Sequence, residues 1–517
     1  MKKRILALLL VIILALSSLS ACDLTKLFPI TPTPPSGESI NDDCIDEDNN
    51  GYCDDCGTYV VVTLDFYTIN DIHGKLFDTD DNVGVDELST YLKTMMSLDD
   101  RAVLLSSGDM WQGTAESSLT RGLMMTDWMN YMNFDAMALG NHEYDWGEEY
   151  VIANNEVAEF PILAINVFDN STNQRVDYCD ASVVVEKDGL KIGIIGAIGN
   201  YHSSISADMS KNFYFKTGSE LSKLIKDEAD RLRREEGVDF IALSLHDGRE
   251  KSNINSGTIS NSALRAYYDI SLSRGYVDVV FEAHTHQSYI LTDSEGIYHI
   301  QAGGENSGIA HAEFSVNYAS NKSKVNTVEI VSDDTYKAYA DDSIIFELTE
   351  KYPEQSAKAT EIIGTLDRTV YSNEIADLVA RLYCQKGVEV WGDKYNIMLG
   401  GGFISTRSPY NMSRGTVAYS DVYSVLPFDN QLVLCSILGK DLKKVFIETT
   451  NTKYHVSYTS FGYSMLDYIE PYETYYVVTD TYTSTYSYNN LTEIQRLDEK
   501  IYARDLLAEY IKAGKLK

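Results

Sequence analysis

Five groups of polar residues that could bind metal ions each follow a short apolar run. Carboxylate and amide side chains offer oxygen ligands, and imidazoles offer nitrogen ligands. The chain has nine histidines, and five of them lie in these groups. In chain order the groups are Asn70-Asp71-Ile72-His73-Gly74, Gly108-Asp109, Gly140-Asn141-His142-Glu143 with Asp145 beyond, His246-Asp247-Gly248 and His284-Thr285-His286.

These residue types favour the chemistry of a divalent metal ion. Asp, Asn and His together suit a borderline divalent cation. Seven such ligands are too many for one tetrahedral ion, but they suit two ions that share a bridging carboxylate. One Asp-x-His or Gly-Asp motif alone is typical of an ordinary turn. Five groups in sequence, each just after an apolar run, indicate a dimetal centre.

The apolar runs themselves have the composition of buried strands. They are Val60–Ile69, Ala102–Ser106, Ala136–Leu139, Ile192–Ala197, Asp239–Leu245 and Asp278–Glu282. Helical patterns lie between them, such as the apolar positions Leu88, Tyr91, Leu92 and Met95. This alternation predicts an α/β domain with a largely buried sheet, whose carboxyl edge brings the ligands together.

Residues of about 60–315 resemble the calcineurin-like metallophosphoesterases, and among them the 5′-nucleotidase and UDP-sugar hydrolase branch. The resemblance rests on the order Asn-Asp-x-His-Gly, Gly-Asp, Gly-Asn-His-Glu-x-Asp, His and His-x-His. Ala283 departs from it, because the family usually has glycine there. The resemblance implies a four-layer sandwich, with helices outside two packed sheets, and a second α+β domain after it.

The same resemblance implies a role for each residue of the five groups. Asp71, His73 and His286 would hold one divalent ion, such as Zn or Mn, Asn141, His246 and His284 would hold a second, and Asp109 would bridge them. His142 would be the catalytic histidine, with Asp145 orienting its ring and favouring its cationic form. The implied reaction is attack of a metal-bound hydroxide on phosphorus, with His142 stabilising the developing charge.

Residues 361–517 resemble the C-terminal domain of the same family. In that family a Gly-rich loop ending in Arg holds the substrate, and the Phe of a Pro-Phe pair stacks on a base. Phe428 matches that aromatic residue. Around Gly400–Gly402 the pattern differs, since Leu399 replaces the usual Asn and Ile404 the usual Arg. Arg407 is the nearest arginine and is assigned the role.

A second aromatic wall for a base is expected near the C-terminus. The family often has a second Phe and a Gly-Gly-Asp stretch there, and this chain lacks the latter. Tyr482 is the best placed substitute, with Tyr486 as the alternate. A helix marked by Ile375, Leu378, Val379 and Leu382 is expected to stop at Gly387.

The N-terminus has the features of an export signal. Basic residues precede an apolar run, Ile5–Leu16, that is too short to span a bilayer. Leu19-Ser20-Ala21-Cys22 resembles a bacterial lipobox, which predicts cleavage before Cys22 and a lipid on that cysteine. The alternative is an ordinary signal peptide. The expected location is the outer face of the bacterial cell membrane, reached by export and lipid anchoring.

A tether with an acidic, cysteine-containing segment is expected between the anchor and the enzyme. Residues 23–40 are rich in proline. Residues 46–57 begin like a calcium loop but end in Gly57, where a bidentate Glu would be expected. An acidic spacer with a Cys53–Cys56 or Cys44–Cys53 bridge is an equal alternative. Cys179, Cys384 and Cys435 are expected to be buried.

The composition limits the partners. A formal net charge of −34 repels phosphate backbones, so nucleic-acid polymers are not expected ligands. No protein partner is indicated.

The predicted parts are a signal peptide (1–21), a tether (22–57), a catalytic domain (58–335), a linker (336–360) and a substrate-binding domain (361–517). The expected function is release of phosphate from nucleoside 5′-monophosphates and related nucleotides. The alternatives are a 2′,3′-cyclic nucleotide phosphodiesterase, a UDP-sugar pyrophosphatase and an inactive surface-binding protein.

Overall fold

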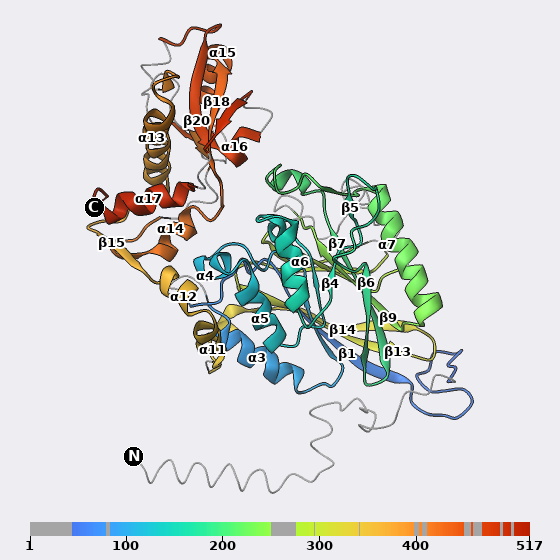
Figure 1. Ribbon diagram of the computed structural model, residues 1–517. Coiled ribbons are helices and arrows are strands. Elements are labelled where there is room, and N and C mark those ends of the chain that lie inside the picture. Colours follow the sequence, from blue (N-terminus) through green and yellow to red (C-terminus); the bar gives the residue numbers. More distant parts are fainter. Residues whose placement is uncertain are drawn as a thin grey trace, which may run out of the picture. The chain divides into compact units, whose positions relative to one another are not determined.

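Two large sheets form the N-terminal domain of the computed structural model (Figure 1). The structure describes residues 44–78, 83–249, 276–293, 295–340, 342–397, 403–405, 411–448, 456–458, 468–485, 490–497 and 501–516. The predicted signal peptide and proline-rich tether lie outside these residues. Within them each large sheet has six strands. The predicted α/β fold is confirmed.

The first sheet has the order β14-β13-β1-β2-β3-β4, and the second has the order β11-β12-β10-β9-β7-β6. The strands of the first sheet are β1 (Val61–Ile69), β2 (Ala102–Ser106), β3 (Ala136–Ala138), β4 (Ile162–Leu163), β13 (Gly308–Asn317) and β14 (Lys322–Ser332). Those of the second are β6 (Ser182–Lys187), β7 (Leu190–Ile198), β9 (Phe240–His246), β10 (Val279–Glu282), β11 (Ser288–Thr292) and β12 (Tyr298–Ala302). Strands β5 (Val167–Asp169) and β8 (Phe213–Phe215) form a separate pair.

A cluster of phenylalanines joins the two sheets face to face. The ring centroid of Phe66 on β1 lies 5.4 Å from that of Phe240 on β9 and 5.5 Å from that of Phe281 on β10. Phe314 on β13 packs against Phe240 at 4.8 Å. These side chains are nearly or fully buried. Strands β9 and β10 are buried along their whole length and are largely apolar, whereas β13 alternates buried and partly exposed residues.

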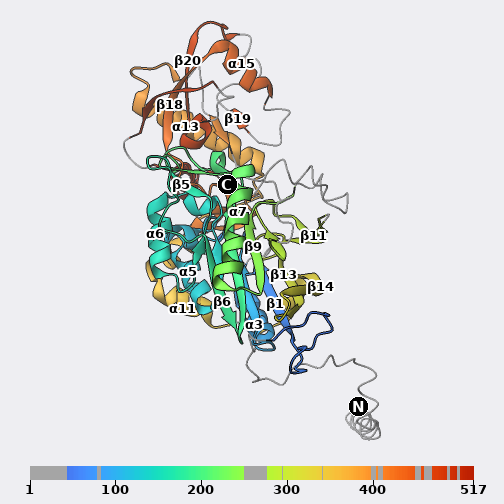
Figure 2. The same cartoon turned by 90° about the vertical axis from the view of Figure 1, so that its right-hand side faces the viewer.

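Helices cover the outer faces of both sheets (Figures 1 and 2). Residues of α3 and α5 share a buried apolar cluster with the first sheet, while α7 packs against the second. This is the expected four-layer arrangement. The helices of this domain are α3 (Asp86–Met96), α4 (Ala115–Leu119), α5 (Leu123–Tyr131), α6 (Glu148–Val157) and α7 (Ser219–Arg231), with short turns at η1 (His142–Tyr144), η2 (His202–Ser204) and η3 (Leu232–Glu236).

Helices span the end of the predicted catalytic domain and the predicted linker (336–360). They are α10 (Asp333–Tyr336), α11 (Ile344–Lys351) and α12 (Pro353–Ala359). Tyr336 is fully buried, and Ile344 and Leu348 are buried in the same cluster as α3 and α5. These apolar side chains explain why the segment folds onto the first domain.

The C-terminal domain is α+β, as expected. Its largest sheet has the order β20-β18-β21, and two smaller sheets pair β15 with β17 and β16 with β19. The strands are β15 (Ile362–Leu366), β16 (Phe403–Ser405), β17 (Gly415–Ala418), β18 (Leu432–Leu438), β19 (Val456–Tyr458), β20 (Thr474–Asp480) and β21 (Thr492–Arg496). The helices are α13 (Ser372–Trp391), α14 (Tyr419–Val425), α15 (Gly439–Glu448), α16 (Thr481–Thr485) and α17 (Ala503–Lys512).

The expectation that Gly387 stops a helix is wrong. Helix α13 passes through Gly387 and ends at Trp391. A Cβ atom at Gly387 would lie 2.3 Å from Cγ2 of Val478 on β20. The glycine therefore lets α13 approach the sheet closely, and it terminates nothing.

The three cysteines of the N-terminal segment are not bridged. Cys44, Cys53 and Cys56 are all free thiols, so neither of the alternative bridges, Cys53–Cys56 or Cys44–Cys53, is formed. Cys179, Cys384 and Cys435 are buried, as predicted. In the described part of the chain, no helix combines the length and apolar character needed to cross a bilayer.

Candidate metal centre

The ends of five strands meet at one edge of the two sheets and bring the predicted ligands together. Strands β1, β2, β3 and β4 run parallel, as do β7, β9, β10 and β12, so their carboxyl ends lie on the same side of each sheet. The polar groups that follow β1, β2, β3, β9 and β10 therefore converge, as the sequence predicts.

Two clusters of ligand atoms result. The ligand atoms of Asp71, His73 and His286 lie within 4.8 Å of one another, and those of Asp109, His246 and His284 form a second such cluster. Nε2 of His73 lies 3.1 Å from Nε2 of His286, and Nε2 of His246 lies 3.1 Å from Oδ2 of Asp109. The clusters are adjacent, because the backbone N–H of His284 donates to Oδ2 of Asp71 at 2.8 Å.

Most of these residues have a left-handed backbone conformation. The φ angle is positive at five of the seven predicted ligands, namely Asp71 (53°), His73 (53°), Asp109 (56°), His284 (72°) and His286 (52°). Each such residue costs about 1–2 kcal/mol unless it is glycine. Strain of this kind persists where the surrounding structure fixes it and is concentrated at functional sites.

The chemistry of the donor atoms fits metal ions. Both polar atoms of the Asn141 amide are buried and have no hydrogen-bond partner among the described residues. Nδ1 of His73 lies 2.9 Å from the carbonyl oxygen of Gln112, and Nδ1 of His246 lies 2.8 Å from that of Ser107. An Nδ1–H that donates to a carbonyl leaves the Nε2 lone pair for a metal. A cation would also satisfy the Asn141 oxygen.

In the centre, burial and neighbouring charges shift the pKa values of His246 and Asp109 in opposite directions. Burial alone would lower the pKa of His246, but the Asp109 carboxylate raises it to about 10. Burial would raise the pKa of Asp109, and His246 and its neighbours instead hold it well below its usual range. Metal binding at His246 therefore has to release a proton, so affinity should fall as the pH falls.

Glu143 organises the centre, although no role was predicted for it. Its carboxylate accepts hydrogen bonds from the backbone N–H groups of Asp109 (2.9 Å), Met110 (2.8 Å), Trp111 (3.2 Å) and Gly140 (2.7 Å). It thus joins the loops that carry Asp109 and Asn141. Burial, together with the charge of Asp109, raises the pKa of Glu143 to about 7. Its position inside the Gly-Asn-His-Glu-x-Asp motif was the available signal.

Gly140 must be a glycine for steric reasons. A Cβ atom there would lie 2.2 Å from Oδ1 of Asp109 and 2.8 Å from Cε1 of His246. The loop after β3 can therefore reach the centre only without a side chain at this position.

The predicted catalytic pair lies beside the first ligand cluster. Nδ1 of His142 is 2.7 Å from Oδ2 of Asp145, and the backbone N–H of His142 donates to Oδ1 of Asp109 at 2.8 Å. The ring centroid of His142 lies 5.3 Å from that of His73. Asp145 is therefore placed to orient the His142 ring, as the resemblance implies.

Two of the predicted substrate-binding aromatics face each other. The rings of Phe428 and Tyr482 are inclined by 13°, and their centroids are 6.4 Å apart. The ring of Phe428 also stacks on that of His142 at 5.8 Å. Arg407, Tyr486 and Cys22 lie outside the described residues, so their predicted roles stay predictions.

Other residues around the centre were not anticipated. The ring of Tyr201 stacks on that of His284 at 3.4 Å, and its hydroxyl donates to Oδ1 of Asp247 at 2.6 Å. It follows β7, a predicted strand to which no polar group was assigned. The side-chain amide of Gln112 donates to the carbonyl oxygen of Pro427 at 3.1 Å.

An acidic side chain connects the two domains at the same place. Asp429 accepts a hydrogen bond from Nη1 of Arg121 at 2.6 Å and pairs with Nη2 of Arg504. Nη1 of Arg504 donates to the carbonyl oxygen of Phe428 at 2.9 Å. The segment that carries Phe428 is thereby fixed from both domains.

The chain is similar to known phosphoesterases along most of its length. Residues 64–288 match the calcineurin-like phosphoesterase family, and residues 367–469 match the 5′-nucleotidase C-terminal domain. An apyrase of Tabanus yao is 25% identical over 427 residues, which are 74% of this chain and 72% of the apyrase. Protein UshA of Yersinia enterocolitica is 26% identical over 426 residues, which are 74% of this chain and 76% of UshA.

A solved structure shows the same fold. The crystal structure of a 5′-nucleotidase precursor from Thermus thermophilus matches with a TM-score of 0.63 at 17% sequence identity. The match covers 88% of this chain and 97% of that chain, so it includes the C-terminal domain.

Replacing Glu143 by Gln should loosen the centre without unfolding the domain. The amide nitrogen of Gln would face backbone N–H donors that a carboxylate satisfies, so the loops of Asp109 and Asn141 would shift. We expect metal affinity to fall by about 10–100-fold, the range for residues that orient ligands. Metal titration measures this, and Glu149→Gln, an exposed neighbour, is the matched control. Unchanged affinity in Glu143→Gln would contradict the role.

Proposed function

We propose that this chain, a metal-dependent phosphoester hydrolase with a calcineurin-like phosphoesterase fold and a C-terminal domain, releases phosphate from nucleoside 5′-monophosphates with two divalent ions. The observation that carries the proposal is the pair of adjacent ligand clusters next to the His142–Asp145 pair. Phe428 of the C-terminal domain extends this site to a second group of the substrate.

The chain's own residues define what each part of the site does. When bound, two divalent ions supply Lewis-acid stabilisation of phosphate and an activated water. Asp71, His73 and His286 would hold one ion, Asn141, His246 and His284 the other, and Asp109 would contact both. Glu143 holds the Asp109 backbone and the Asn141 loop at fixed positions by accepting hydrogen bonds from both. The Nδ1–H groups of His73 and His246 are directed at carbonyls, which fixes both rings.

His142 is the group that would hold a proton near the phosphate. Its Nδ1 lies 2.7 Å from Oδ2 of Asp145, and in the imidazolium form Nε2 is the second donor of the ring. A carboxylate at this distance stabilises the imidazolium form. A proton on Nε2 can offset charge on a phosphoryl oxygen or on the departing alkoxide. This role needs no metal bond to His142.

Phe428 and Tyr482 offer aromatic surface to a flat group of the substrate. Their rings are nearly parallel, with an angle of 13° and centroids 6.4 Å apart. A stacked base contributes on the order of 1–3 kcal/mol per aromatic contact. A purine or pyrimidine therefore suits this aromatic pair.

Cyclic nucleotides and UDP-sugars remain the alternative substrates, because the metal centre would serve all three reactions. The C-terminal residues around Phe428 and Tyr482 decide among them. A panel of AMP, 2′,3′-cyclic AMP and UDP-glucose, assayed with added Mn²⁺ or Zn²⁺, separates the three. No hydrolysis of any of them would support the surface-binding alternative.

Two histidine and aspartate variants separate metal binding from proton transfer. His142→Asn should keep about two metals per chain and lower kcat by about 10²–10⁴-fold. Asp109→Ala should lose both metal and activity, because it removes the ligand common to both ions. Elemental analysis and phosphate release from AMP measure the two effects. His311→Asn, on strand β13, is the control histidine. Metal loss in His142→Asn would instead make His142 a ligand.

Replacing Phe428 by Ala should affect substrates with a base selectively. We expect kcat/KM for AMP to fall by about 10-fold or more, since one stacking contact is lost. Hydrolysis of p-nitrophenyl phosphate should change far less. Phe346→Ala, at an exposed phenylalanine of α11, is the control. An equal loss on both substrates would point to a packing defect, and no loss would place the base elsewhere.

We also propose that the chain is exported and anchored by a lipid on Cys22. The support is the basic N-terminus, the short apolar run and the Leu19-Ser20-Ala21-Cys22 sequence. The native chain should fractionate with membranes, and Cys22→Ser should lose that attachment. A native chain found wholly in the soluble fraction would contradict the anchor. Cys179→Ser, at a buried cysteine, is the control.

A further inference from the structure

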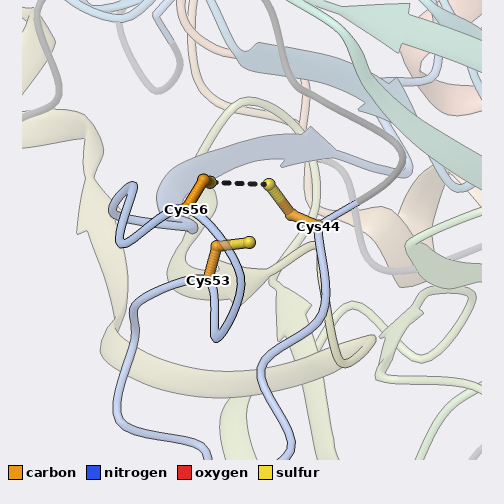
Figure 3. A group of neighbouring side chains, drawn as sticks. All are labelled: Cys44, Cys53 and Cys56. Carbon is orange, nitrogen blue, oxygen red and sulfur yellow. Dashed lines mark hydrogen bonds between the residues drawn. The ribbon is translucent and has the colours of Figure 1, made fainter.

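Three cysteines of the N-terminal segment direct their sulfurs at one point. The sulfurs of Cys44, Cys53 and Cys56 lie within 4.8 Å of one another. Figure 3 shows the three side chains converging from two stretches of the segment. Cys44 and Cys53 are buried, and Cys56 is exposed. None of the three belongs to the phosphoesterase centre.

The spacing of the sulfurs suits a shared metal ion. Sγ of Cys44 lies 3.8 Å from Sγ of Cys56. A disulfide requires about 2.05 Å. A tetrahedral zinc ion with Zn–S bonds of about 2.3 Å holds two sulfurs about 3.8 Å apart. A bridge between two of the cysteines would also leave the third thiol unused.

A tight turn links Cys53 and Cys56. The turn is closed by Gly57, whose N–H donates to the carbonyl oxygen of Cys53 at 2.8 Å and whose φ is 74°. The N–H of Cys53 in turn donates to the carbonyl oxygen of Thr58 at 2.7 Å. This turn places Cys53 and Cys56 on the same side.

We propose that Cys44, Cys53 and Cys56 form a structural binding site for one thiophilic cation, Zn²⁺, with its fourth position on the exposed side of Cys56. Thiolate ligands select zinc and copper(I) over calcium and magnesium. Binding releases the proton of each thiol that coordinates. The site is separate from the predicted calcium loop, whose oxygens come from other residues.

The segment needs such a cross-link because its own core is small. The apolar cluster consists of Cys44, Cys53 and Val60, with Tyr318 and Ala319 packed against it. Among residues 44–60, the β-pairing consists of one isolated antiparallel bridge between Tyr52 and Tyr59. Segments with so little buried apolar surface usually depend on disulfides or a structural metal. A bound ion would stabilise the folded segment by mass action.

The neighbouring acidic residues give weaker support for a metal site. Oxygens of Asp46, Asp48 and Asp54 lie within 4.8 Å of one another. However, the Asp46 carboxylate already accepts hydrogen bonds from the N–H groups of Asn50 and Gly51 and from the side chain of Asn317. Calcium binding by residues 46–57 therefore stays a prediction.

Cobalt(II) distinguishes the thiolate site from the catalytic centre in the full chain. Co²⁺ bound by thiolates gives an intense sulfur-to-metal charge-transfer absorption, which Asp, Asn and His ligands do not give. We expect this band in the reduced wild-type chain and its disappearance when Zn²⁺ is added. Zinc should also slow alkylation of the three thiols by at least about tenfold, because the metal occupies the reactive thiolates.

Matched serine variants decide the assignment. Cys53→Ser and Cys56→Ser should lose the band, while Cys179→Ser, a buried cysteine outside the cluster, should retain it. Hydrolysis of p-nitrophenyl phosphate by Cys56→Ser, whose side chain is exposed, should match wild type and so report an intact fold. A wild-type chain without the band, or variants that keep it, would overturn the proposal. So would a disulfide among these cysteines in the mature protein, found by mass spectrometry.

Discussion

One buried carboxylate constrains the geometry of the whole metal centre. Glu143 accepts hydrogen bonds from four backbone N–H groups in the turns after β2 and β3. These turns carry Asp109 and Asn141. A carboxylate offers acceptor sites on both of its oxygens, whereas an amide of the same shape offers them on one. Because the backbone at Asp109 is left-handed, the turn needs such external support to persist.

The candidate site includes residues of both domains. The ring of His142 lies 5.3 Å from that of His73, a predicted ligand, and 5.8 Å from that of Phe428. The residue proposed to handle the proton is therefore adjacent to the residue proposed to hold the base. Under this proposal, substrate recognition and chemistry would be joined through neighbouring side chains.

The sequence predicted what depends on local pattern and spacing. The strand ends and their ligands were found because apolar runs are followed by metal-binding residue types. The motif marks Glu143, but its role was missed because its partners are backbone N–H groups of turns that only the fold brings together. Gly387 was misread because its reason is Val478, a residue far along the chain that only the fold brings near. The alternatives for Cys44, Cys53 and Cys56 stayed open for the same reason, since spacing cannot show that three thiols lie close together.

The shared use of Asp429 has a consequence for how separable the two domains are. One carboxylate pairs with Arg121 of the first domain and Arg504 of the second, and Arg504 also holds the carbonyl of Phe428. A catalytic domain excised without its C-terminal partner would keep Arg121 but lose the anion that Asp429 supplies. Transplanting either domain would therefore require a new partner for Arg121 and a redesign of this junction.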